Sequence, residues 1–206
     1  MEPVTEAQLR ASFVNCSKGE AKRLVVPRDL AERPWADLDF LGWVDPGAPE
    51  RAYIVAERPS AGSADTTGSA NTTGSANTAD GSGGELIGLT LRSTSALAKR
   101  ATMCAFCLTT HPGQGVGLLT ARKSGASGRE GNSVGTYICS NLACSLYVRG
   151  LKTPPPGGRL KEELSLVDQV ERMRDNLFSF IDRVLDLTTS TKVASTRAST
   201  TPSTTP

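Results

Sequence analysis

The chain has 206 residues, of which 38% are hydrophobic and only 5% aromatic, and its formal net charge is +2. This length fits one ordinary domain or two small ones, and the low aromatic content indicates that part of the chain is not packed. No run approaches the roughly 18 apolar residues of a membrane span, and residues 1–10 lack the apolar core of a secretory signal. We therefore expect a cytoplasmic protein without a membrane partner.

The first 50 residues are predicted to form a small helical segment. Thr5 is a suitable cap for a short helix over residues 5–16. A break is expected at residues 17–20, and a second short helix is expected to begin at Glu20. Residues 35–44 contain both tryptophans and much of the apolar mass of this segment.

Residues 51–92 are predicted to form a β-hairpin with a long insertion. Strands are expected over residues 52–57 and 85–92, which are bounded by turn-forming residues. Between them, residues 60–84 are almost entirely Ser, Ala, Gly, Thr, Asn and Asp, and the hexapeptide Thr-Thr-Gly-Ser-Ala-Asn occurs twice in succession. Such a segment has little apolar surface to offset its ordering entropy, so it is predicted to be a disordered insertion.

Residues 164–187 carry the clearest helical pattern in the chain. Their apolar residues recur at steps of three and four and form one stripe, and Ser165 is a suitable N-terminal cap. We expect an amphipathic helix that packs on the core or on a partner. Residues 188–206, rich in Ser, Thr and Pro, are predicted to be a disordered tail.

Four of the five cysteines occur as two close pairs, Cys104 with Cys107 (C-x2-C) and Cys139 with Cys144 (C-x4-C). Two short pairs at long separation supply the four thiolates of a tetrahedral structural zinc site. In the cytoplasm, paired cysteines are metal ligands more often than disulfides. The sequence therefore predicts one structural Zn2+ ion on these four cysteines.

Two further residues leave alternatives open. His111 lies four residues after Cys107 and is the alternative fourth ligand, because sites with three cysteines and one histidine also bind structural zinc. The simpler interpretation of His111 is a loop residue before a Pro-Gly turn. Cys16 is interpreted as a free cysteine, buried or half-buried at a helix end.

The segments between and after the cysteine pairs define the predicted fold. Strands are expected over residues 115–122 and 135–138, and the second pair requires Cys144 on the first turn of a helix. We call the turn formed by each cysteine pair a knuckle. The order of first knuckle, hairpin, second knuckle and helix is that of a treble-clef zinc finger, which we assign to residues 93–187. We expect an α+β protein: the N-terminal helical segment of residues 1–50, a short antiparallel sheet, the zinc finger and the C-terminal helix.

No catalytic residue is predicted. Four thiolates would close the metal site, whereas a catalytic zinc keeps an open position. The chain has one histidine, and residues 124–133 lack the Gly-Lys-Ser/Thr ending of a phosphate-binding loop. We therefore expect neither enzymatic activity nor a small-molecule substrate, and a redox or metal-dependent enzyme is the weakest alternative.

The zinc-finger segment is strongly basic. Residues 92–159 contain nine lysines and arginines and one acidic residue, Glu130, a balance that attracts polyanions or an acidic protein face. Two groups of candidate contact residues stand out, at the glycine- and serine-rich tip of the hairpin and near the second knuckle. They are Arg122, Lys123, Arg129, Tyr137, Tyr147, Arg149 and Lys152. The alternative is a solvated basic loop with both tyrosines in the core.

Four stretches of the sequence resemble one known family. They are Thr102–His111, Gly131–Cys139, Cys144–Gly150 and Ala11–Glu20. Together they resemble the elongation-factor-G-binding proteins with a C-terminal treble-clef zinc finger, which include the fusidic-acid-resistance proteins. The resemblance covers most of residues 5–187 apart from the insertion.

This resemblance implies a function. The resistance proteins bind elongation factor G through the zinc-bearing domain and release it from ribosomes on which the drug has stalled it, without modifying the drug. Their site uses three cysteines and one histidine, which keeps His111 as an alternative ligand. We expect a monomeric translation protein that binds elongation factor G, with the ribosome or ribosomal RNA as further partners; the alternative is a zinc finger that binds RNA directly.

Overall fold

The computed structural model describes residues 1–59, 84–93, 101–156, 158 and 162–187. The predicted disordered insertion, apart from Gly84, and the predicted tail over residues 188–206 lie outside the described residues. Within the described part, no helix combines the length and the apolar character needed to cross a membrane.

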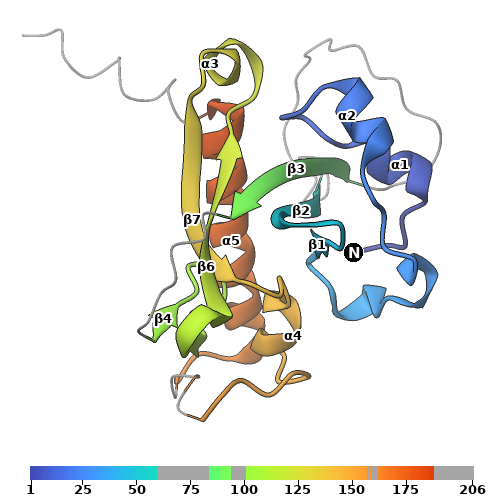
Figure 1. The fold of residues 1–206 in the computed structure, drawn as a ribbon. Coiled ribbons are helices and arrows are strands. Elements are labelled where there is room, and N and C mark those ends of the chain that lie inside the picture. The colour runs from blue at the N-terminus through green and yellow to red at the C-terminus, as the bar shows by residue number, and fades with distance from the viewer. Residues whose placement is uncertain (60–83, 94–100, 157, 159–161, 188–206) are drawn as a thin grey trace, which may run out of the picture.

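An antiparallel sheet of five strands forms the centre of the molecule (Figure 1). Its strands, in spatial order, are β1 (Phe40–Asp45), β2 (Ala48–Arg58), β3 (Glu85–Ser93), β6 (Val116–Arg122) and β7 (Ser133–Cys139). The predicted α+β class is confirmed, as are the four strands expected from the sequence. β1 is additional, because residues 35–44 were assigned no strand.

Short helices precede the sheet: α1 (Glu6–Ala11), α2 (Lys18–Arg23) and the 3-10 turns η1 (Leu30–Glu32) and η2 (Trp35–Asp37). The first helix was expected over residues 5–16 but ends at Ala11. The prediction of a break at residues 17–20 is wrong, because α2 begins at Lys18 with Ser17 as its N-terminal cap. The Ser17 hydroxyl accepts a hydrogen bond from the Glu20 amide at 3.2 Å, and the Glu20 carboxylate accepts one from the Ser17 amide at 2.8 Å. This reciprocal capping box starts a helix rather than interrupting one.

The remaining elements are the short segments around the cysteines, the helix at the hairpin tip and the long C-terminal helix. They are β4 (Thr102–Met103), β5 (Thr110–His111), η3 (Gly113–Gly115), α3 (Gly125–Arg129), α4 (Cys144–Val148) and α5 (Leu166–Leu185). The last is the predicted amphipathic helix, and Ser165 caps it by accepting a hydrogen bond from the Asp168 amide at 3.2 Å. α3 occupies the hairpin tip, for which no helix was predicted.

The central part of β1, β2 and β3 is buried on both faces. On one face, Ile54 and Leu89 share a hydrophobic cluster with α5 residues such as Met173. On the other face, Tyr53 and Val55 pack against the N-terminal layer, which we define as residues 1–39. Neighbouring strand residues point to opposite faces, so burial on both sides explains the continuous apolar run in β2.

The N-terminal layer is fixed to β3 through a close backbone approach. The amide of Val14 donates to the Gly88 carbonyl at 3.0 Å, and the Gly88 amide donates to the Ser12 carbonyl at 2.8 Å. A Cβ atom at Gly88 would lie 2.6 Å from the Ser12 hydroxyl. Only glycine therefore allows this approach without displacement.

The sheet divides where β3 meets β6. These strands pair at two positions, Arg92 with Thr120 and Ser93 with Leu119. Beyond them, the Asn15 amide bridges the strands, donating to the carbonyls of Thr90 and Arg122 at 3.0 Å each. The predicted division of the chain at residues 50 and 92 stays a prediction.

Candidate metal centre

Four cysteines converge from three elements. Cys104 and Cys107 lie in the turn between β4 and β5, Cys139 ends β7, and Cys144 is the first residue of α4. The expectation that the second pair requires Cys144 at a helix start is confirmed. Short backbone turns thus bring together ligands that are up to 40 residues apart.

The sulfur geometry fits a tetrahedral metal ion. All four cysteines are buried, and their Sγ atoms lie within 4.8 Å of one another. The Cys104 and Cys144 sulfurs are 3.7 Å apart, and those of Cys107 and Cys139 are 3.6 Å apart. A zinc ion with Zn–S bonds of about 2.3 Å requires S–S distances of about 3.8 Å. The four side chains therefore form the site of one structural zinc ion.

Backbone hydrogen bonds shape the first knuckle around Cys104. Its carbonyl accepts from the Leu108 amide at 3.0 Å, its amide donates to the Thr109 carbonyl at 2.9 Å, and its sulfur accepts from the Phe106 amide at 3.4 Å. Leu108 adopts a left-handed conformation with φ of 55°. Such a conformation costs a leucine about 1–3 kcal/mol, so the surrounding contacts must enforce this turn.

The four crowded sulfurs perturb one another's pKa values. The pKa of Cys107 is lowered, first by hydrogen bonding from Cys104 and then from Cys139. The pKa of Cys139 is raised, first by its interaction with Cys104 and then by that with Cys107. Four thiolates cannot coexist in a buried space without a cation, and a divalent ion supplies the missing positive charge.

His111 lies beside the cysteine set rather than within it. Its Nε2 atom is 3.5 Å from the Cys139 sulfur, and its ring packs edge-on against Tyr147 with centroids 4.9 Å apart. Burial lowers the pKa of His111, which disfavours the charged form of the ring. The group of ligand atoms that all lie within 4.8 Å of one another contains the four cysteines and not His111.

The structure separates six of the seven predicted contact residues into two groups and places Tyr137 in β7. Arg122, Lys123 and Arg129 lie at the α3 end of the β6–β7 hairpin; Tyr147, Arg149 and Lys152 lie in or just after α4, at the opposite end (Figure 1). Tyr137, in β7, is 49% exposed, whereas Tyr147 is 4% exposed. The two ends do not form one continuous patch.

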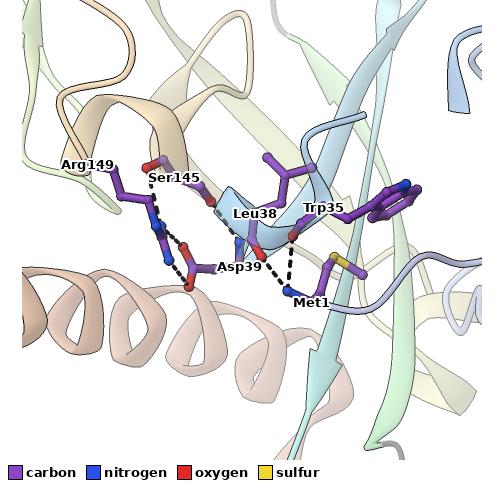
Figure 2. Close-up of polar contacts among 6 residues, drawn as sticks. All are labelled: Met1, Trp35, Leu38, Asp39, Ser145 and Arg149. Atoms are coloured by element: carbon purple, nitrogen blue, oxygen red, sulfur yellow. Dashed lines mark hydrogen bonds and ion pairs between the residues drawn. The ribbon is translucent and has the colours of Figure 1, made fainter. Parts of the chain in front are cut away.

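Two of these seven residues are engaged in ion pairs. Lys123 contacts Asp186 at 2.7 Å. Arg149 binds both oxygens of Asp39, with the Nη2–Oδ1 distance at 3.1 Å (Figure 2). Hydrogen bonding to Asp39 raises the pKa of Arg149. These cations serve internal contacts in addition to any role at the surface.

Figure 2 also shows residues that sequence reasoning missed around Asp39. The Asp39 amide donates to the Ser145 hydroxyl at 3.0 Å, and Ser145 follows the last cysteine directly. The Met1 amino group donates to the Leu38 carbonyl at 2.7 Å. The N-terminal layer is therefore linked to the second knuckle through Asp39. Because 110 residues separate Asp39 from Arg149, no local sequence signal could have identified this link.

Comparison with known proteins identifies the family. The family model described as the FBP C-terminal treble-clef zinc-finger matches residues 8–184. No significant match to a curated protein or to a solved structure was found. The match spans most of the chain, including all four cysteines and the strands that carry them. The chain therefore belongs to the FBP C-terminal treble-clef zinc-finger family.

Proposed function

We propose that this protein is a non-catalytic translation protein that binds elongation factor G through its zinc-finger region and promotes release of the factor from the ribosome. The family match over residues 8–184 carries the proposal, because the fusidic-acid-resistance proteins that the sequence resembles act in this way. The site of action is then the cytoplasm, and a monomer suffices for it.

The chemistry of the metal centre supports a binding role. A zinc ion on four thiolates has no open position for water or substrate, so it organises the fold rather than activating a nucleophile. The four cysteines are at most 7% exposed. The metal would therefore act indirectly, by holding the knuckles that present the binding surface.

We place the contact with elongation factor G on the exposed members of the predicted set, which lie in two areas: Arg122 and Arg129 at the α3 end of the hairpin, and Lys152 at the α4 end, with Tyr137 on β7. Tyrosine and arginine are the residue types that most often anchor interfaces. Lys123, Tyr147 and Arg149 then support this surface from within, through Asp186, His111 and Asp39 respectively. The complementary surface of the factor should be acidic.

Calorimetric titration of the zinc-loaded protein into elongation factor G of the same organism, at two salt concentrations, tests the proposal. We expect stoichiometric binding that Tyr137→Ala weakens about tenfold or more, as at an interface anchor. Arg174→Gln, on α5, is the control and should bind as the unmodified protein does. Absence of association at micromolar concentrations would contradict the proposal.

Direct binding of RNA by the zinc finger is the second candidate, favoured by the nine basic residues and one acidic residue between positions 92 and 159. Because Lys123 and Arg149 form ion pairs, the exposed cations Arg129 and Lys152 would carry this role. Phosphate-dominated binding weakens steeply with salt. RNA affinity that is insensitive to salt, or unchanged in Arg129→Gln/Lys152→Gln, would exclude this candidate.

A further inference from the structure

A polar groove lies between the N-terminal layer and the β6–β7 hairpin, beside the point where β3 and β6 diverge. Its volume is about 480 Å³, and its walls come from α2, β2, β3, β6 and the start of β7. Figure 1 shows α2 and α3 on the two sides of this part of the molecule. None of the four cysteines of the metal centre lines the groove.

Four exposed arginines line the groove: Arg23, Arg51, Arg92 and Arg122. The strand register places three of them on one face of the sheet. Arg51 is directly opposite Arg92, and Arg92 is directly opposite Thr120. Arg122 follows Thr120 by two residues, so its side chain points to the same face. Arg23 comes from the end of α2 and completes the cluster from the opposite wall.

The two carboxylates in the groove are already engaged. Asp45 is 6% exposed, and it accepts hydrogen bonds from the Tyr53 hydroxyl at 3.0 Å and the Gly47 amide at 2.9 Å. Glu20 caps α2 through Ser17. Four positive charges against two negative ones therefore leave the groove basic.

The four arginines are largely free of ion-pair partners. Arg51 has one contact, with Glu50 at 3.8 Å, in which both side chains are about half exposed. Within the described part of the chain, Arg23, Arg92 and Arg122 have no ion pair within 4.0 Å. Glu20 interacts electrostatically with Arg23 and Arg122 without an ion pair within 4.0 Å, so the guanidinium groups keep donors available to a ligand.

The direct opposition of Arg51 and Arg92 is unfavourable for the fold alone. Like charges at directly opposite positions of adjacent strands destabilise a sheet, and a bound anion would remove this repulsion. Features that weaken a fold locally are expected at functional sites. Exposed Lys18 and Lys22 on α2 and Arg129 on α3 extend the positive charge along both sides of the groove.

We propose that this groove binds the phosphodiester backbone of a nucleic acid. Guanidinium groups bind phosphate oxygens bidentately, and the hydroxyls of Thr120 and Ser133 in the same lining are further donors. A protein partner is disfavoured, because the large apolar residues of the lining are buried, as Tyr53 at 2% exposure illustrates, and so offer no anchor. For the same reason no ring is available to stack on bases, so binding is independent of sequence.

This site shares Arg122 with the surface proposed for elongation factor G, but its test rests on Arg51 and Arg92, which lie outside that surface, so the two proposals can fail separately. The probes are fluorescent oligouridylate and oligothymidylate of about 16 nucleotides, with a polyglutamate peptide of equal charge as the competing class. Anisotropy is measured with the zinc-loaded full chain over a range of salt concentrations. The test variant is Arg51→Gln/Arg92→Gln. The control is Arg28→Gln/Arg174→Gln, which removes the same charge outside the groove.

We expect the test variant to lose about tenfold in affinity, and its log–log salt slope to fall by about 1.4, since each single-strand phosphate contact contributes about 0.7. The control should retain both values. Arg23→Gln, on the opposite wall, provides a second variant with a smaller loss. Thermal midpoints and zinc content establish that each variant is folded.

Equal affinity for the RNA and DNA probes would support recognition of the phosphodiester backbone alone. A preference for the RNA probe would also support the proposal and would identify RNA as the ligand. Three results would overturn the proposal: no salt-dependent binding, an equal loss in test and control variants, or polyglutamate binding as tightly as the oligonucleotides. Titration of the same variants into elongation factor G separates this outcome from that of the proposed function, because Arg51 and Arg92 lie outside the surface assigned to the factor.

Discussion

The zinc region, residues 101–156, and the N-terminal layer are both built from elements too short to be stable alone. In the zinc region β4 and β5 have two residues each and α4 has five, and in the N-terminal layer α1 and α2 have six each. Isolated helices shorter than about 12 residues are marginal in water. Each region therefore needs another source of order, and the two regions use different ones.

In the zinc region the four cysteines supply that order, whereas the N-terminal layer relies on aromatic packing and capping boxes. Phe13 packs edge-on against Trp43 and Tyr53, with centroids 6.3 and 6.0 Å away. The Trp43 indole donates to the Val25 carbonyl at 2.9 Å. The comparison teaches that the metal orders the two cysteine turns, which lie at the edge of the main hydrophobic cluster, so perturbations should separate the two regions.

Loss of the metal should have the largest effect. Cys144→Ser, or a strong chelator, should unfold the zinc region, because structural zinc contributes about 10–16 kcal/mol of apparent binding energy to folding. Cys16→Ser is the matched control, since Cys16 is half-buried and lies outside the cysteine cluster. We expect it to cost less than about 1 kcal/mol. Zinc content and thermal unfolding are measured for both variants. Equal effects of Cys144→Ser and Cys16→Ser would refute the ligand assignment.

The ion pair between Asp39 and Arg149 joins the two regions, and breaking it should have the next largest effect. Asp39→Asn should cost about 3–5 kcal/mol, because it leaves a partly buried guanidinium without its partner; the side chains are 5% and 19% exposed. The pair of Asp29 with Arg33, whose side chains are 53% and 30% exposed, is the control, and Asp29→Asn should cost at most about 1 kcal/mol. Denaturant unfolding with a double-mutant cycle at Asp39 and Arg149 measures the coupling, and additive losses would show that the pair does not link the regions.

A second link is the Asn15 amide, at the point where β3 and β6 diverge. Asn15→Ala leaves the Thr90 amide and the carbonyls of Thr90 and Arg122 without these partners, and should cost about 2–3 kcal/mol. Asn132→Ala is the control, because Asn132 is exposed and donates to one hydroxyl. Hydrogen exchange should show faster opening of β6 in Asn15→Ala. Unchanged protection of the β6 amides would mean that the two residue pairs between β3 and β6 hold these strands together without Asn15.

The sequence predicted the parts of the molecule that depend on local pattern. The spacing of the cysteine pairs predicted the zinc ion, and the three- and four-residue steps predicted α5. β1 was missed because Phe40 and Leu41 are both about 1% exposed and pack on opposite faces of the sheet. A strand buried on both faces shows no alternation.

Contacts between distant segments were beyond local pattern. Arg149 carries the sequence signature of a surface cation, yet its partner lies 110 residues away. The arginine groove likewise depends on strand register, which places Arg51 opposite Arg92 although 41 positions separate them in the chain. Charge counts along the sequence could show that the zinc finger is basic. They could not show that residues of the N-terminal layer, such as Arg23, line the same groove.

The smallest predicted effect is a gain in stability at that groove. Arg92→Gln removes the repulsion with Arg51, and without a ligand it should raise the free energy of unfolding by about 0.2–1 kcal/mol. Arg28→Gln removes the same charge from an exposed position outside the groove and should leave stability unchanged. Denaturant midpoints at low salt measure the difference, which should shrink as salt screens the pair. A loss of stability in Arg92→Gln would mean that this arginine serves the junction of β3 with β6 rather than a ligand.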